Sequence, residues 1–438
     1  MTDAWATAER IRTGELSAGT VAEAALERAH ADPHNMFTVV TDSLAREAAA
    51  AVDAGEVRGP LAGVPITVKD HVWLAGQPAT NGSRALREFV PSESAVCVER
   101  LLAAGAVVIG KTNNPEFCYR GTTDNELFGA TANPRDPTRT AGGSSGGAAA
   151  SVAAGIVALA VGTDGGGSIR IPSAFCGVYG LKPSFGVVPK MPGFAGWPTL
   201  SVTGPIAASV RDLELALSVM AGPDPADWLS GPSLDPAPGA LRIGVCADFA
   251  AVDDDVREAF EAAVARLPDV EVVDVPRDDP LALWDAVALP EGYASEGALV
   301  EAHPDLVGRD AAELALAGRG YSARDYLDAQ QARSRYAAAW AAVFTRVDAL
   351  LMPAMPTTAF ALDRLRPETI AGEPVPDGFD TWCALALPAN LAGLPAVAVP
   401  VGTGADGLPV AAQVLAARWH DSTALRVAAA LEAVVASP

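Results

Sequence analysis

"IVALAVGTDGGGSIRIPSAF", residues 156 to 175, combines three features: an apolar run, a glycine loop and a segment that can open a helix. The apolar run is typical of a strand that is buried on both faces. Successive glycines allow backbone N–H groups to converge on one point, as an oxyanion site requires. Ser168 ends the loop, so it is well placed to attack a carbonyl carbon whose oxygen these N–H groups hold. The alternative is a glycine loop made for tight packing, with a serine that caps the helix.

Short apolar runs closed by glycine or proline recur along the chain: "GVPITVK", "AGAVVIGK", "GVYGLKPS", "LRIGVCA" and "VDALLMPA". The stretches 94–104 and 210–220, which lie between such runs, are predicted to be helical. The N-terminal "TAERIRTGELSAGTVAEAALERAHA" predicts one or two amphipathic helices. Short strands that alternate with helices predict an α/β protein with a largely buried sheet.

A stretch rich in proline, glycine and aspartate, 221–240, is the best candidate for a seam in the chain. The segment 386–416 has the same strand-and-turn texture as 61–190, so we expect it to rejoin the first sheet. The middle of the chain is then an insertion and not a separate domain. We predict one domain over 1–438, with a catalytic core at 60–210 and a variable substrate-pocket segment at 221–380.

The composition is that of a globular and strongly acidic chain. Of its 438 residues 50% are apolar and 19% are charged, and the formal net charge is −22. Such a surface repels phosphate backbones, which argues against direct contact with nucleic acid. The N-terminus lacks the apolar core of a signal peptide, and the longest apolar stretch, 148–162, is too short to span a membrane. Five scattered cysteines without metal-binding spacing favour a reducing compartment, so we expect a cytoplasmic protein without a structural metal.

A second glycine-serine cluster, "RTAGGSSGGAAAS" at 139–151, precedes the first. It lacks the lysine of a phosphate loop and the spacing of a dinucleotide fingerprint. It does match G-x-S-x-G around Ser144, the nucleophile elbow of α/β-hydrolases, for which His420 could serve as the base. The stretch before it, "TANPRDPTRTA", contains two prolines and no strand pattern, so we favour Ser168 as the nucleophile.

A serine nucleophile needs a base, and none of the five histidines stands in a recognisable setting. Lys69 ends the apolar run of "GVPITVKDH" and is expected to be largely desolvated. Burial disfavours the ammonium form and lowers the pKa of a lysine, so its neutral amine can accept a proton. An ordinary surface charge is the alternative interpretation of Lys69.

Five segments together resemble the amidase signature family: "GGSSGG", "GTDGGGSIRIPSAFCGVYGLKPS", "GVPITVKD", "GKTNNPEF" and "NLAGLPAVAVPVG". The resemblance is strong over 60–210 and near 385–415, and it is weak between 220 and 380. It implies an α/β fold with a single large mixed sheet that is covered on both faces by helices.

The resemblance also implies a Ser-cisSer-Lys triad. In it Ser168 is the nucleophile, Lys69 is the base, and Ser144 bridges them, with a cis peptide bond between Gly143 and Ser144. Water then releases the acyl-enzyme, and no cofactor or metal is needed. The expected oxyanion donors are the N–H groups of Gly165, Gly166, Gly167 and Ser168.

Three further residues, Ser145, Asp164 and Arg170, match signature positions and are expected to support the loops without taking part in the chemistry. Position 71, commonly asparagine in the family, is His71 here, and packing is its expected role. Cys118 has no electropositive neighbour in sequence, so we do not expect it to be a nucleophile.

The substrate channel is expected to include four side chains. Cys118 and Tyr119 fall where relatives line the channel, and Tyr119 could stack on an aryl group. Phe194 and Trp197 in "MPGFAGWP" suggest an apolar lip that favours hydrophobic substrates.

The main functional hypothesis is an amidohydrolase that cleaves small amides, anilides or carbamates, with an esterase side activity. The alternative is the glutaminase subunit of a tRNA-dependent amidotransferase, which works in a complex and channels ammonia. Such subunits tend to be longer and to carry an acidic residue just before the segment "LPANLAGLP", and Cys383 lies at about that place in this chain. A binding protein without catalytic activity is a third hypothesis. The resemblance implies a homodimer, which the sequence itself leaves open.

Overall fold

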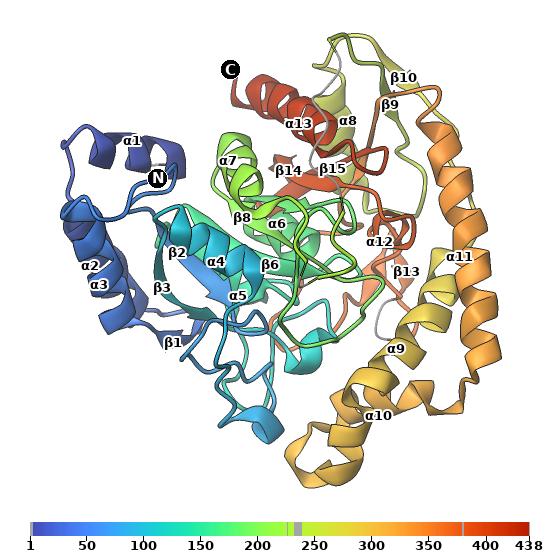
Figure 1. Cartoon of the computed structure of the whole chain (residues 1–438). Coiled ribbons are helices and arrows are strands. Elements are labelled where there is room, and N and C mark those ends of the chain that lie inside the picture. The colour runs from blue at the N-terminus through green and yellow to red at the C-terminus, as the bar shows by residue number, and fades with distance from the viewer. Residues whose placement is uncertain (1–2, 226, 232–238, 379–380, 438) are drawn as a thin grey trace.

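An eleven-stranded mixed sheet organises the chain, in the strand order β1-β3-β2-β6-β8-β7-β14-β15-β11-β9-β10 (Figure 1). The computed structural model describes residues 3–225, 227–231, 239–378 and 381–437. The strands of the sheet are β1 (Phe37–Val40), β2 (Pro65–Lys69), β3 (Val107–Thr112), β6 (Leu159–Asp164), β7 (Tyr179–Lys182), β8 (Val202–Ala207), β9 (Ile243–Val245), β10 (Val270–Val272), β11 (Ala349–Pro353), β14 (Ala396–Thr403) and β15 (Pro409–Ala416).

The sheet is mixed because it contains both parallel and antiparallel pairs of neighbouring strands. β2 lies parallel to both β3 and β6, whereas β8 is antiparallel to β6 and β7. β14 joins β7 in antiparallel register, which confirms that the C-terminal segment rejoins the first sheet. The middle of the chain contributes β9, β10 and β11 to the same sheet.

The helices are α1 (Ala4–Arg12), α2 (Ala18–His30), α3 (Asp42–Asp53), α4 (Val96–Ala103), α5 (Gly146–Ala153), α6 (Arg170–Cys176), α7 (Val210–Met220), α8 (Asp254–Val264), α9 (Pro280–Ala302), α10 (Arg309–Ala317), α11 (Ala323–Val343), α12 (Leu387–Leu391) and α13 (Asp421–Ala436). The N-terminal segment thus forms two helices, and α7 covers the predicted 210–220. Among the described residues no helix is long and apolar enough to cross a membrane.

Helices cover both faces of the sheet because successive strand residues point to opposite sides. In β3, Val108 packs in the cluster that α4, α7 and α13 cover, whereas Val107 and Ile109 pack with α2, α3 and α5. β2 and β6 lie in the middle of this double-sided arrangement, and all their residues are buried. The last residues of the two strands, Lys69 and Asp164, are therefore shielded from solvent.

One local expectation is wrong. The stretch before the second glycine-serine cluster forms a two-stranded sheet of β4 (Ala132–Asn133) and β5 (Asp136–Thr140). A proline is tolerated in β5 because this small sheet has only edges, where no inner ladder bond is lost. A further two-stranded sheet pairs β12 (Thr369–Ile370) with β13 (Glu373–Pro374).

The helices α9, α10 and α11 lie together on the side of the molecule opposite α1, α2 and α3 (Figure 1). They belong to the segment predicted to be variable. Within the predicted seam at 221–240, residues 226 and 232–238 lie outside the described residues. The domain limits stay a prediction.

Candidate active site

Lys69 is the last residue of β2, and its side chain is fully buried. Its Nζ atom donates hydrogen bonds to Ser144 Oγ at 2.7 Å and to Thr163 Oγ1 at 2.8 Å. Thr163 belongs to β6, the parallel neighbour of β2, so strand pairing itself sets this contact. Burial lowers the pKa of the Lys69 amine. Lys69 is therefore a desolvated lysine and not a surface charge.

Ser144 lies in the loop before α5, and the Gly143–Ser144 peptide bond is cis. A Cβ atom added at Gly143 would lie 2.3 Å from the carbonyl oxygen of Thr122, so only glycine fits there. Ser144 is fully buried, and its hydroxyl accepts the hydrogen bond of Lys69.

Ser145 joins the two glycine-serine loops. Its N–H donates to the carbonyl oxygen of Ser168 at 3.1 Å, and its hydroxyl donates to the carbonyl oxygen of Thr163 at 3.2 Å. Ser168 itself stands between β6 and α6 and is 7% exposed. The structure thus brings Lys69, Ser144 and the loop that ends at Ser168 together.

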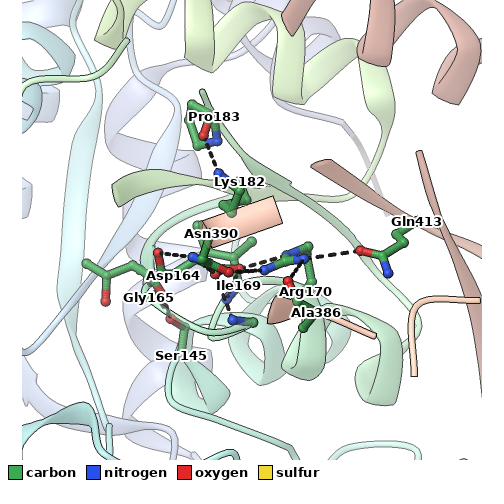
Figure 2. Close-up of polar contacts among 12 residues, drawn as sticks. Ser145, Asp164, Gly165, Ile169, Arg170, Lys182, Pro183, Ala386, Asn390 and Gln413 are labelled. Atoms are coloured by element: carbon green, nitrogen blue, oxygen red, sulfur yellow. Dashed lines mark hydrogen bonds and ion pairs between the residues drawn. The ribbon is translucent and has the colours of Figure 1, made fainter. Parts of the chain in front are cut away.

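Asp164 and Arg170, which flank the glycine loop in sequence, form a buried ion pair (Figure 2). The guanidinium donates to both carboxylate oxygens at 3.0 Å, and both side chains are 0% exposed. Asp164 also accepts the N–H groups of Gly167 at 2.8 Å and Ile169 at 3.2 Å. Burial alone would raise the Asp164 pKa, but Arg170 holds it well below its usual range. This carboxylate fixes the loop from within.

One expected oxyanion donor is wrong for this reason. The N–H of Gly167 is bonded to the Asp164 carboxylate, so it is not available to a substrate oxygen. Gly165, Gly166 and Ser168 stay predicted donors. The carbonyl oxygen of Gly165 accepts the indole N–H of Trp284 at 3.2 Å, which orients the first peptide of the loop.

Aromatic side chains lie against the same loop. A Cβ atom added at Gly165 would lie 2.5 Å from the Trp197 ring, and one at Gly166 would lie 3.3 Å from Trp284. Tyr119 stacks on Trp197 with a centroid separation of 5.3 Å. Phe194 packs with a different group of rings, and its ring centroid lies 5.6 Å from those of His71, Trp73 and Phe89.

The surroundings of Cys118 were not apparent from its neighbours in sequence. Lys69 and His71 come from the end of β2 and the residues after it, and both lower the pKa of the Cys118 thiol. That Cys118 is not the nucleophile stays a prediction. His71 Nδ1 lies 3.0 Å from Asn81 Oδ1, and the His71 ring packs against Phe194.

The elbow interpretation of Ser144 has no support in the geometry. The Ser144 hydroxyl is bonded to Lys69, and His420 is an exposed residue at the start of α13. In a nucleophile elbow the serine hydroxyl is hydrogen-bonded to the catalytic histidine. The partner of the Ser144 hydroxyl is the amine of Lys69 instead.

The amidase family model matches residues 20–425. This chain belongs to the amidase signature family. It is 36% identical to a subunit of the glutamyl-tRNA(Gln) amidotransferase of Synechococcus sp. (strain CC9605), over 96% of the chain and 94% of that protein.

Two solved structures are also similar to this family member. One is described as a vestigial protein complex that reveals the evolutionary origins of an s-triazine catabolic enzyme, with a TM-score of 0.92, 36% identity, and coverage of 98% of this chain and 97% of the other. The second is a bacterial aryl acylamidase of the amidase signature family, with a TM-score of 0.90, 31% identity, and coverage of 99% and 96%.

Sequence reasoning missed several residues of this amidase family member. Asn390 in α12 accepts from Arg170 at 2.6 Å and donates to Asp164 at 2.9 Å, and Gln413 in β15 accepts from Arg170 at 3.1 Å (Figure 2). Asn390 belongs to the "NLAGLP" segment that carries the resemblance, which was the available signal. Trp284 lies in the variable segment and gave no signal.

Proposed function

We propose that this chain hydrolyses the C–N bond of small amides through an acyl-enzyme on Ser168. The observation that carries the proposal is the hydrogen bond of 2.7 Å between Lys69 Nζ and Ser144 Oγ, both fully buried. A buried lysine loses its proton more readily than an exposed one, so it can act as a base. Lys69 is then the base, and Ser144 is the bridge to the nucleophile.

The proposed reaction passes protons between Ser168, Ser144 and Lys69. Neutral Lys69 takes the proton of Ser144 while Ser144 takes that of Ser168, whose oxygen bonds to the carbonyl carbon. Backbone N–H groups of the glycine loop hold the oxyanion, a contribution of about 3 kcal/mol for each donor. The C–N bond then breaks, the amine leaves with the proton returned through Ser144, and water hydrolyses the remaining ester.

The surroundings of the loop favour an apolar substrate. Trp197, Trp284 and Ala386 lie against the three glycines, and none of these side chains carries a charge. Anilides, carbamates and other amides with apolar groups suit such a wall, since aromatic faces bind flat apolar groups well. Esters of the same acyl groups are expected as faster side substrates.

A second candidate is the glutaminase subunit of a tRNA-dependent amidotransferase, which acts in a complex. Identity of 36% to such an amidotransferase subunit over nearly the whole chain favours it. Glutamine, however, carries an ammonium and a carboxylate, which sites bind with opposite charges. Such subunits tend to carry an acidic residue just before the segment "LPANLAGLP", and Cys383 lies at about that place here. Overall similarity therefore favours the glutaminase, whereas the residues of the site favour the small-amide hydrolase.

A comparison of turnover rates on different substrates separates the two candidate functions. We would assay the purified chain with an anilide, an aryl carbamate, an aliphatic amide and glutamine, with Ser168→Ala as the matched control. The proposal predicts turnover of the apolar amides at least tenfold faster than that of glutamine. Faster glutamine hydrolysis, or activity that appears only with copurified partner subunits, would establish the second candidate. Gel filtration of the same sample tests the expected homodimer.

A further inference from the structure

Arg333 of α11 is partly buried and donates hydrogen bonds to two segments that lie far apart in the sequence. Its Nη1 atom donates to Thr199 Oγ1 and its Nη2 atom to the Thr199 carbonyl oxygen, both at 2.8 Å. Its Nε atom donates to the carbonyl oxygen of Leu391 at 2.8 Å, and Nη2 also donates to that of Asn390 at 3.3 Å. One side chain of the variable segment therefore joins the loop before β8 to helix α12.

The first of these two segments is a turn that begins at Trp197. The N–H groups of Leu200 and Ser201 both donate to the carbonyl oxygen of Trp197, at 3.2 Å and 2.9 Å. Thr199 lies within this turn, so a side chain that holds Thr199 also holds the start of the turn. The Trp197 ring lies against the glycine loop, since a Cβ atom added at Gly165 would be 2.5 Å from it. The turn thus connects the guanidinium to the wall of the proposed substrate site.

The second segment is the C-terminal end of α12. The last carbonyl groups of a helix lack partners within the helix, and a cation near them is favourable. Arg333 supplies both the N–H donors and the charge to the carbonyls of Asn390 and Leu391. The Asn390 side chain in turn donates to the Asp164 carboxylate at 2.9 Å and accepts from Arg170 at 2.6 Å. The helix end that the guanidinium holds therefore carries a direct partner of the ion pair at the glycine loop.

Helix α9 lies beside α11 and contacts the same turn (Figure 1). Glu291 of α9 is 4% exposed, and it accepts hydrogen bonds from the N–H of Thr199 at 3.1 Å and from its hydroxyl. The Thr199 hydroxyl thus joins a carboxylate of one helix to a guanidinium of the other. Farther along α9, Glu296 accepts from the hydroxyl of Tyr119 at 2.5 Å, and the Tyr119 ring stacks on Trp197. Both helices therefore hold the turn and its tryptophan.

The shape of a guanidinium explains why an arginine suits this place. Its N–H groups form a rigid planar fork that points in several fixed directions. All three nitrogens of Arg333 donate here, and their acceptors belong to segments that share no other side chain of α11 as a common donor among the described residues. A lysine ammonium is a single point on a flexible stem, so it could not serve both segments in the same geometry.

We propose that Arg333 is a positioning residue that fixes Trp197 and Asn390 relative to each other and so holds the glycine loop of Ser168 in its active shape. It acts through these two residues and contacts none of the reacting groups. Helices α9 and α11 of the variable segment then stabilise the catalytic loop as well as frame the pocket. The effect on catalysis rests on the proposed function, whereas the effect on the order of the loops does not.

The direct test is amide hydrogen exchange, measured by mass spectrometry on the wild type, Arg333→Met and Arg335→Met. Arg335 lies in the same helix and is exposed, so its variant is the matched control. In Arg333→Met the amides of Leu200 and Ser201 should exchange about tenfold faster, because the turn loses hydrogen bonds to a charged group. Thr199→Val removes one hydroxyl and should show a smaller increase. Wild-type exchange of this turn in Arg333→Met, or in Thr199→Val where the methionine variant does not fold, would overturn the proposal.

The kinetic test compares an anilide with a short aliphatic amide. We expect the ring of the anilide to lie against Trp197, so Arg333→Met should lower kcat/KM about tenfold for the anilide and less for the aliphatic amide. In Arg333→Ala, guanidinium ion at a non-denaturing concentration should restore part of the activity, and it should have no such effect in Arg335→Ala. Equal losses on both substrates without rescue would mean that Arg333 only supports the fold, which contradicts the proposal. Hydrogen exchange needs no turnover, so an enzyme inactive on every amide would refute the proposed function and leave the exchange result to decide this inference.

Discussion

The Nζ atom of Lys69 lies 2.7 Å from the Oγ atom of Ser144, at the end of a strand whose five residues are all buried. The parallel neighbour strand supplies Thr163 as the second partner of the amine. This arrangement places a desolvated amine against Ser144, whose neighbour Ser145 is hydrogen-bonded to Ser168.

Removing the amine should abolish most of the activity. In Lys69→Ala we expect kcat to fall by about 10²- to 10⁴-fold, the usual contribution of a positioned base. Steady-state kinetics on an anilide measure the loss, and added methylamine should restore part of the rate. Because burial lowers the Lys69 pKa, wild-type kcat/KM should rise with pH and level off below about 10.4, the value of an exposed lysine. Full activity in the alanine variant would contradict this role.

Breaking the buried ion pair should cost far more stability than breaking an exposed one. Asp164→Asn leaves Arg170 buried without its counter-charge, which costs about 3–5 kcal/mol in free energy of unfolding. The matched control is Asp348→Asn, whose partner Arg242 is 55% exposed, with an expected cost below about 1 kcal/mol. Urea unfolding followed by circular dichroism gives both values. Equal losses would mean that the pair does not hold the loop.

The same carboxylate should make stability depend on pH. The pKa of Asp164 is depressed in the folded chain, since Arg170 outweighs burial. Its contribution is therefore fully present above the unfolded value of about 4 and is lost as pH falls through the folded value. Urea unfolding between neutral pH and about pH 3 should show a steeper decline in the wild type than in Asp164→Asn. Parallel curves would exclude Asp164 as the source.

Gly143 should not tolerate a side chain. Its added Cβ would meet the Thr122 carbonyl at 2.3 Å, so Gly143→Ala must displace the loop that carries Ser144. We expect at least a hundredfold loss of kcat/KM, an effect of about 3 kcal/mol. Gly320→Ala is the control, because a Cβ atom at Gly320 meets nothing within 4 Å. Comparable kinetics in the two variants would refute the tight fit.

Trp284 should affect the chemical step through the peptide of Gly165. Trp284→Phe keeps a ring against Gly166 but loses the hydrogen bond to the Gly165 carbonyl. One hydrogen bond is worth about 1 kcal/mol, so kcat should fall about fivefold. Trp340→Phe is the control, since the Trp340 indole nitrogen is buried without a hydrogen-bond partner. A change confined to KM would show that Trp284 only contacts substrate.

The sequence predicted the parts of the site that lie beside strand ends. Lys69 ends an apolar run that predicted its burial, and Asp164 lies in a segment that carries the resemblance. The parallel pairing of β2 and β6, which places them at one edge of the sheet, is a finding of the structure. Asn390 lay within a segment that carries the resemblance, but its partner Arg170 is far away in sequence. No local pattern could reveal that contact.

The neighbours of Cys118 were not predictable for a related reason. The pKa of its thiol depends on Lys69 and His71, which lie more than forty residues away in sequence, and the chain at Phe117 and Cys118 is left-handed. A positive φ at a bulky residue has no sequence signature, since tertiary packing enforces it. Glu296 and Trp284 come from a long helix whose placement over the loop depends on the whole fold.

The measurement that tests the central claim most directly is mass spectrometry of peptides after reaction with a fluorophosphonate probe. We predict that Ser168 of the wild type carries the label and that Lys69→Ala loses it, with a far-ultraviolet spectrum that matches the wild type. Label on Ser144 that persists in Lys69→Ala and disappears in His420→Ala would contradict the account and establish the nucleophile elbow instead.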